Sequence, residues 1–169
     1  MSARSLAVPN LLLNYLCCYS KFLLLSEYPL TLTSMTKPAI LCVDDEKIVL
    51  DNLREQLQST FGDRFEYEVA ESVEEAWEVI EWLQEDGCEF VLVISDWLMP
   101  MTKGDKFLVD VHERFPGTVK IMLTGQADPE AVENARENAN LFAYLRKPWT
   151  EETLVARVND ALDKLDMNT

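Results

Sequence analysis

The chain has 169 residues, of which 48% are apolar and 27% are charged, and its net charge is −15. This length holds one domain of ordinary size, and the composition is that of a globular protein rather than a disordered or fibrous one. A surface this acidic is repelled by phosphate backbones, so we expect no direct binding of nucleic acid.

Residues 1–35 differ in composition from the rest of the chain, because they are rich in Leu, Tyr, Ser and Cys and almost uncharged. Their apolar run, 11–25, contains polar residues and is shorter than the roughly 20 residues that span a bilayer. No clear cleavage site of small residues follows it. We expect residues 1–35 to be a leader outside the folded domain, either disordered or an extension from an upstream start codon. The alternative is a weak anchor at a membrane surface, although membrane association is not favoured.

After residue 38, short apolar runs alternate with amphipathic segments. The apolar runs predict five β-strands, at 39–43, 65–70, 90–95, 119–123 and 141–145. The amphipathic segments, where apolar residues recur every three or four positions, predict helices at 46–60, 72–86, 104–115, 128–139 and 150–165. Three of these helices begin with capping signals, namely Ser72 with Glu75, Asp128 before Pro129, and Thr150.

Regular alternation of strand and helix predicts an α/β fold, a doubly wound five-stranded parallel sheet with helices on both faces. Nearly continuous apolar sequence in three of the strands agrees with a sheet that is covered on both faces. In such sheets, ligands bind outside the carboxyl ends of the strands, near the point where strand order reverses. The residues that directly follow the strands are therefore the candidate site.

Polar residues follow four of the five predicted strands. In chain order they are Asp44 and Asp45, then Asp96, then Thr124 with Gly125, and finally Lys147 with Pro148. Each alone has a structural explanation: Asp45 as a helix cap, Thr124 as a turn residue, Lys147 as a solvated charge. Three carboxylates, a hydroxyl and an ammonium on one edge of a sheet favour a functional site instead.

The three carboxylates cannot gather while ionised unless a cation joins them, because two unit charges about 4 Å apart repel by about 4 kcal/mol at an effective dielectric near 20. A site made only of oxygen atoms, with room for water and phosphate, suits Mg²⁺. The single histidine, His112, lies in a predicted helix and no cysteine lies at this edge, so zinc is not indicated.

The cysteines give no second site. No spacing among them is typical of a metal knuckle or a redox pair, and the four are Cys17, Cys18, Cys42 and Cys88. Cys42 lies within a predicted core strand. We expect reduced thiols, as in a cytoplasmic protein.

Four short motifs follow in order: VDDE at the end of the first strand, ISDWLMPMTKG around the third, LTG after the fourth, and YLRKP at the fifth. Each is weak alone, but together and in this order the pattern resembles the CheY-like receiver domain of bacterial two-component response regulators. The resemblance covers residues 38–165 and implies the flavodoxin-like (βα)5 receiver fold, with residues 36–169 as the domain.

The resemblance implies that Asp96 is the phosphoacceptor, which takes its phosphoryl group from a sensor histidine kinase or a histidine phosphotransfer protein. It implies that Mg²⁺ is held directly by Asp45, largely through water by Asp44, and by Asp96 and the backbone carbonyl of Leu98. Lys147 and Thr124 would then contact oxygens of the phosphoryl group.

Further positions of the family pattern imply structural and switching roles. Gly125 would leave space at the site, Pro148 would follow a cis peptide bond, and Pro100 and Gly104 would shape the loop after Asp96. Tyr144 would be the aromatic residue that turns inward when Thr124 moves toward the phosphate; the alternative is an ordinary strand aromatic half in the core.

Phosphorylation would then change binding of an effector protein, or homodimerisation, through the 128–165 face. Trp149 stands where the family often has phenylalanine, and Trp97 follows Asp96; both would tune docking. Leu98 and Gln126 occupy positions that influence hydrolysis. Because an apolar Leu98 side chain cannot orient water, we predict a long-lived aspartyl phosphate.

Two other functions are considered. A haloacid-dehalogenase-like phosphatase has its nucleophile in a D-x-D motif after the first strand, whereas here Glu46 stands two residues after Asp44. A receiver-like interaction module that works without phosphorylation usually lacks a key residue, and none is missing. We therefore expect a regulatory phosphoprotein rather than an enzyme, either alone or as one part of a longer regulator.

Overall fold

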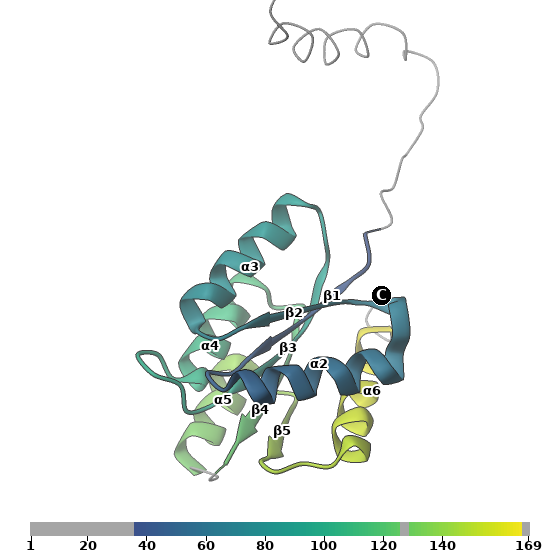
Figure 1. Cartoon of the computed structure of the whole chain (residues 1–169). Helices are drawn as coiled ribbons and strands as arrows, with labels where there is room; N and C mark the ends of the chain where they lie inside the picture. The colour runs from purple at the N-terminus through teal and green to yellow at the C-terminus, as the bar shows by residue number, and fades with distance from the viewer. Residues whose placement is uncertain (1–35, 126–128, 167–169) are drawn as a thin grey trace, which may run out of the picture. The chain divides into compact units, whose positions relative to one another are not determined.

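A computed structural model describes residues 36–125 and 129–166 (Figure 1). The predictions for the 1–35 leader, for Gln126 and for the Asp128 cap lie outside the described residues.

Five strands and five α-helices alternate along the described chain. The strands are β1 (Ala39–Val43), β2 (Glu66–Ala70), β3 (Phe90–Asp96), β4 (Val119–Thr124) and β5 (Ala143–Arg146). The helices are α2 (Lys47–Phe61), α3 (Val73–Glu85), α4 (Gly104–Arg114), α5 (Pro129–Ala139) and α6 (Glu151–Asp166), with one 3₁₀ turn, η1 (Gly62–Arg64), after α2. The predicted elements are all present, and their bounds differ from prediction by at most two residues.

The strands form one sheet in the order β2-β1-β3-β4-β5, and every neighbouring pair is parallel. The chain moves outward from β1 to β2, then returns past β1 to β3, so strand order reverses between β1 and β3. The predicted doubly wound α/β fold is confirmed. Its topology places the carboxyl ends of β1 and β3 side by side at the switch point, where ligands bind in sheets of this kind.

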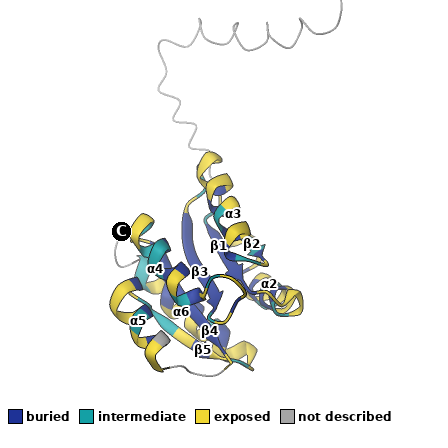
Figure 2. Ribbon diagram, turned by 90° about the vertical axis from the view of Figure 1, so that its left-hand side faces the viewer, coloured by how far each residue is buried: buried dark blue, intermediate teal, exposed yellow. Residues whose placement is uncertain are grey.

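Helices cover both faces of the sheet, so the domain has two hydrophobic layers (Figure 2). One layer joins apolar side chains of α2 and α6 to the sheet, including Leu53 and Val158. The other joins α3, α4 and α5 to the opposite face, including Ile80 and Phe107. All residues of β1, β3 and β4 are buried, whereas the edge strands β2 and β5 are partly exposed. Coverage on both faces explains the nearly continuous apolar runs.

Side chains at two helix starts act as predicted, with one correction. Ser72 Oγ accepts a hydrogen bond from Glu75 N at 3.1 Å, and Thr150 Oγ1 accepts one from Thr153 N at 3.3 Å. The Glu75 carboxylate, however, accepts from Glu71 N at 2.7 Å instead of from Ser72 N. The second hydrogen bond of this capping box therefore comes from the backbone N–H one residue before the N-cap, and it still satisfies a backbone donor before α3.

Within the two described ranges, no helix has both the length and the apolar character needed to cross a bilayer. Cys42 lies buried in β1, and burial raises the pKa of its thiol to about 12. This thiol stays protonated at neutral pH and is chemically inert.

Candidate functional site

The carboxyl edge of the sheet gathers polar side chains from four strand ends. Asp44 directly follows β1, Asp96 is the last residue of β3, and Thr124 is the last residue of β4. Lys147 directly follows β5, and its backbone N–H donates to the Thr124 carbonyl at 2.8 Å. Because parallel strands end at the same edge, residues more than a hundred positions apart in the chain meet there.

Three carboxylates form a compact cluster at this edge. Oxygen atoms of Asp44, Asp45 and Asp96 all lie within 4.8 Å of one another. Asp44 and Asp96 are buried, whereas Asp45 is exposed to solvent. Among the residues that the structure describes, this is the one group of three or more such side chains that could hold a metal ion.

The Lys147 ammonium lies between the two buried carboxylates. Its Nζ is 2.6 Å from Asp44 Oδ2 and 3.2 Å from Asp96 Oδ1, and the Lys147 side chain is only 17% exposed. Lys147 is therefore not a solvated surface charge, which was the structural explanation considered for it. A third acidic group, exposed Glu46, has its Oε1 at 3.9 Å from the same nitrogen.

The pKa shifts indicate surplus negative charge. Burial raises the pKa of Asp44 above its ordinary value, and the hydrogen bond from Lys147 only partly opposes this. Burial likewise raises the pKa of Asp96, again opposed by Lys147 and increased by Asp44. Burial lowers the pKa of Lys147, but Asp44 and Asp96 outweigh it, so the net shift is upward. One ammonium does not offset three carboxylates, so the cluster favours a further cation.

The acidic doublet is not explained by helix capping. The N-cap residue of α2 is Glu46, whose side chain makes no capping bond. Asp44 Oδ1 instead accepts a hydrogen bond from Glu46 N at 3.0 Å, which fixes the turn between β1 and α2. The capping hypothesis for Asp45 is therefore not supported by the local geometry.

The loop between β3 and α4 passes close to Asp96. A Cβ atom at Gly104 would overlap the Asp96 carbonyl oxygen, and Gly104 N donates to the Trp97 carbonyl at 2.9 Å. Glycine is thus required at 104. The loop also contains Pro100 and the exposed Leu98, and Met101 has φ 67°, a conformation uncommon outside glycine.

The remaining predicted positions lie around this cluster. The Lys147–Pro148 peptide bond is cis, as predicted. Thr124 is buried, whereas Tyr144 is 43% exposed, with the Arg136 guanidinium 5.8 Å from its ring centroid. Tyr144 is therefore partly exposed, at the surface beside Arg136. A Cβ atom at Gly125 would meet no atom within 4 Å, so protein packing alone does not require glycine there.

Two contacts around the site were not predicted from the sequence. Glu46 was assigned no role, although its position next to the acidic doublet was a signal for its approach to Lys147. Trp149 donates its indole N–H to Gln56 Oε1 at 3.0 Å, across 93 positions of the chain. No local pattern indicates that pairing, because it depends on how α2 lies against the loop after β5.

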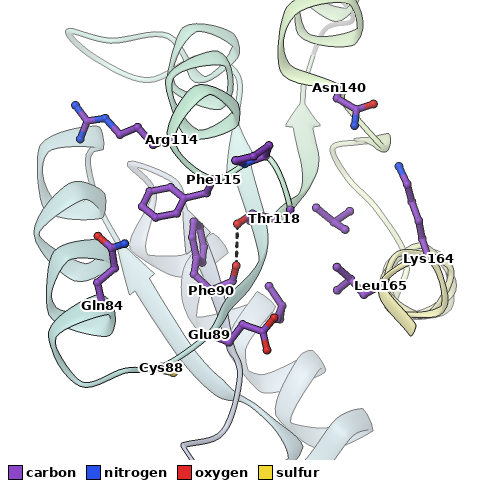
Figure 3. Close-up of a pocket in the computed structure, with 14 residues that line it drawn as sticks. Gln84, Cys88, Glu89, Phe90, Arg114, Phe115, Thr118, Asn140, Lys164 and Leu165 are labelled. Carbon is purple, nitrogen blue, oxygen red and sulfur yellow. Dashed lines mark hydrogen bonds between the residues drawn. The ribbon is translucent and has the colours of Figure 1, made fainter. Parts of the chain in front are cut away.

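A cavity of about 610 Å³ lies away from this cluster, at the amino ends of β3 and β4 (Figure 3). Phe90 and Phe115 line it with Thr118, whose hydroxyl donates to the Phe90 carbonyl at 2.7 Å. The clustered carboxylates Asp44, Asp45 and Asp96 do not line this cavity, and neither does Lys147. The candidate site is thus defined by converging charge and not by cavity volume.

Comparisons with known proteins agree with this arrangement. A model of the response regulator receiver domain matches residues 40–159. The hydrogenase transcriptional regulatory protein HoxA of Cupriavidus necator is 30% identical over 124 residues, which are 73% of this chain and 24% of HoxA. This chain thus spans about a quarter of that relative's length.

Solved structures extend the similarity to three dimensions. A CheY-like response regulator receiver domain protein from Methanospirillum hungatei superposes with a TM-score of 0.69 at 30% identity, over 79% of this chain and 100% of that one. The receiver domain of an HD-domain protein from Pseudomonas fluorescens gives 0.69 at 27% identity, over 78% and 98% of the two chains. With its fold, its edge cluster and these matches taken together, the chain belongs to the receiver domain family of two-component response regulators.

Proposed function

We propose that Asp96 is the phosphoacceptor of this receiver domain. The observation that supports this most strongly is the Lys147 ammonium, which contacts both Asp96 and Asp44 beside a third carboxylate. A buried carboxylate that already has a cation at its oxygen is suited to attack an electrophile that brings its own negative charge. Phosphoryl transfer needs positioned positive charge of this kind.

In the proposed reaction, an Asp96 oxygen attacks the phosphorus atom of a phosphohistidine. The P–N bond breaks, and its electron pair leaves with the imidazole of the donor. Lys147 turns from the carboxylates toward one phosphoryl oxygen, and the Thr124 hydroxyl donates to another. Asp96 thereby becomes an acyl phosphate, with a charge near −2 and three strong acceptor oxygens.

The donor set fits a hard divalent cation. All its side-chain ligands are carboxylate oxygens within 4.8 Å of one another, and burial raises the pKa of Asp44 and of Asp96, so a cation beside them would favour their ionised forms. We propose that Asp45, Asp96 and the Leu98 carbonyl hold Mg²⁺ directly, and Asp44 largely through water. An ion held there would supply positive charge that offsets the charge of the carboxylates and of the incoming phosphoryl group.

Phosphorylation would act as a switch because Thr124 and Lys147 can satisfy the new oxygens in only one loop arrangement. Tyr144 is then proposed to leave its exposed position and turn inward. The 128–165 face would bind an effector protein or a second copy of the chain, and the donor would be a sensor histidine kinase or a histidine phosphotransfer protein. We further propose that the protein acts in the cytoplasm, as a regulator and not a turnover enzyme.

The test is phosphorylation by a small donor. Native protein incubated with acetyl phosphate and Mg²⁺ should gain one acid-stable, base-labile phosphoryl group by mass spectrometry, and chelator should prevent it. Asp96→Asn should abolish labelling, while Asp86→Asn, at an exposed residue after α3, should leave it intact. Labelling that persists in Asp96→Asn would disprove the assignment.

The same assay separates the alternatives. Rapid, repeated turnover of an aryl phosphate would indicate a phosphatase, and no labelling at all would indicate a module that works without phosphorylation. Because the Leu98 side chain cannot orient water, we further expect the aspartyl phosphate to last for minutes. A half-life of seconds in the presence of Mg²⁺ would contradict that expectation.

A further inference from the structure

A single hydrogen bond joins the loop after β5 to helix α2. The Trp149 indole N–H donates to Gln56 Oε1 at 3.0 Å. The Trp149 ring also packs against the hydrophobic layer between α2, α6 and the sheet. Gln56 lies more than two turns into α2, well beyond the acidic doublet that precedes this helix. Helix α2 begins just after the acidic doublet, and the loop begins with Lys147. The bond therefore connects two segments that both start at the site.

Lys147 lies in this loop, two residues before Trp149. Strand β5 ends at Arg146 and α6 begins at Glu151, so only four residues connect them. On one side, the Lys147 N–H donates to the Thr124 carbonyl at 2.8 Å, which holds the loop to β4. On the other side, Trp149 holds it to α2. The Lys147 backbone thus lies between two anchors.

The contact between the loop and α2 is only partly packed. An open pocket of about 390 Å³ lies beside the Trp149–Gln56 bond, and both segments line it. Its walls include Val49, Asn52 and Gln56 of α2, with Lys147, Pro148 and Trp149 of the loop. Because the pocket leaves part of this contact unfilled, the hydrogen bond adds to the packing of the Trp149 ring in holding the loop to α2.

The position of the loop matters because Lys147 carries its charge on a long, flexible side chain. The ammonium can reach a phosphoryl group on Asp96 only if it is held close to that carboxylate, and here its Nζ lies 3.2 Å from Asp96 Oδ1 and 2.6 Å from Asp44 Oδ2. In catalysis generally, a misplacement of about 1 Å can lower a rate by roughly a hundredfold. A shift of the Lys147 Cα atom is transmitted to the ammonium or must be absorbed by an unfavourable rotamer.

We propose that Trp149 and Gln56 form a positioning pair that aims the Lys147 ammonium at Asp96 and so sets the rate of phosphorylation. The inference rests on the proposed function, because it concerns the reaction at Asp96. A phenylalanine at position 149 could fill the same apolar space, but it has no N–H to donate. The hydrogen bond, and not the ring alone, is the positioning element.

The experiment measures the rate of Asp96 phosphorylation by acetyl phosphate at saturating Mg²⁺. Trp149→Phe and Gln56→Met each remove one partner and should lower the rate about three- to tenfold, in line with one lost hydrogen bond. Gln56→Glu keeps an acceptor and should stay within about twofold of native protein. Gln58→Met, the same change at an exposed position of α2, is the matched control and should have no effect.

A cycle with Lys147 separates positioning from a merely structural role. In a Lys147→Gln background, Trp149→Phe should change the remaining rate less than about 1.5-fold, because there is no ammonium left to aim. The Mg²⁺ affinity of Trp149→Phe should equal that of native protein, since the pair does not touch the carboxylates. An equal loss of rate in both backgrounds, or weaker Mg²⁺ binding, would overturn the proposal.

The outcomes for the two proposals are distinct. Native protein that takes up no phosphoryl group would disprove the proposed function. Native protein that is labelled at Asp96 while Trp149→Phe and Gln56→Met react at the native rate would disprove the positioning pair alone.

Discussion

The two edges of the sheet contrast in a way that locates the chemistry. The carboxyl edge holds three carboxylates and an ammonium in close contact, two of the carboxylates buried. The amino edge holds the cavity of about 610 Å³, whose charged lining residues are the exposed Glu89 and Arg114 and the partly exposed Lys164. Arg114 lies over the Trp77 ring, 4.4 Å from its centroid, which is a packing contact.

The difference shows that buried charge is better evidence of function than volume. Burying ions costs several kcal/mol unless they are paired, so a fold keeps them only where they are needed or fully compensated. At the carboxyl edge compensation is incomplete, as the raised pKa values of Asp44 and Asp96 indicate. A cavity between helix ends has no comparable cost and arises readily from loop packing.

The largest expected effect comes from the same lysine substitution made at each edge. Lys147→Gln should slow phosphorylation by acetyl phosphate about a hundredfold, because it removes positive charge aimed at the reacting oxygens. Lys164→Gln, in the wall of the amino-edge cavity, should leave the rate unchanged. Rates from quenched time courses at saturating Mg²⁺ provide the measurement. Equal rates for both variants would erase the proposed contrast between the edges.

A pair of glycine substitutions tests the same contrast through stability. Gly104→Ala should lower the free energy of unfolding by about 1 to 3 kcal/mol, because its Cβ would overlap the Asp96 carbonyl. Gly117→Ala, at the amino edge, meets no atom within 4 Å and should change stability by less than about 0.5 kcal/mol. Urea denaturation followed by circular dichroism measures both. A fully stable Gly104→Ala would mean that the β3–α4 loop is free to move.

Sequence alone predicted the sheet and the residues at its carboxyl edge. The reason is physical: in a parallel sheet the position of Asp44, Asp96 or Lys147 at a strand end is enough to place it at one edge. The strand ends were recognisable because the buried runs are almost purely apolar. The alternation with helices then fixed the topology to a doubly wound sheet.

Features that depend on contacts between distant elements were not predictable. Lys120 interrupts the run VKIML, yet it is buried, with Nζ 2.9 Å from His112 Nδ1 and 3.4 Å from the Phe115 carbonyl. His112 of α4 therefore pairs with a buried lysine. The partly exposed position of Tyr144 and the Trp149–Gln56 bond likewise depend on helix placement, which periodicity does not specify.

The smallest expected effect is a pH-dependent gain in stability when charge is removed from the carboxyl edge. Because burial raises the pKa of Asp96, the folded state binds its proton more tightly than the unfolded state does. Stability contributed by this group is therefore lost as pH rises through the raised pKa.

With Mg²⁺ removed by chelator, Asp96→Asn should be more stable than native protein by about 1 kcal/mol at pH 7, and the gain should vanish near pH 4. Urea denaturation measures the difference, with Glu89→Gln, at an exposed position of the amino edge, as the matched control. An Asp96→Asn variant less stable than native protein at pH 7 would mean that Lys147 already compensates the cluster, and that the two edges do not differ in unbalanced charge.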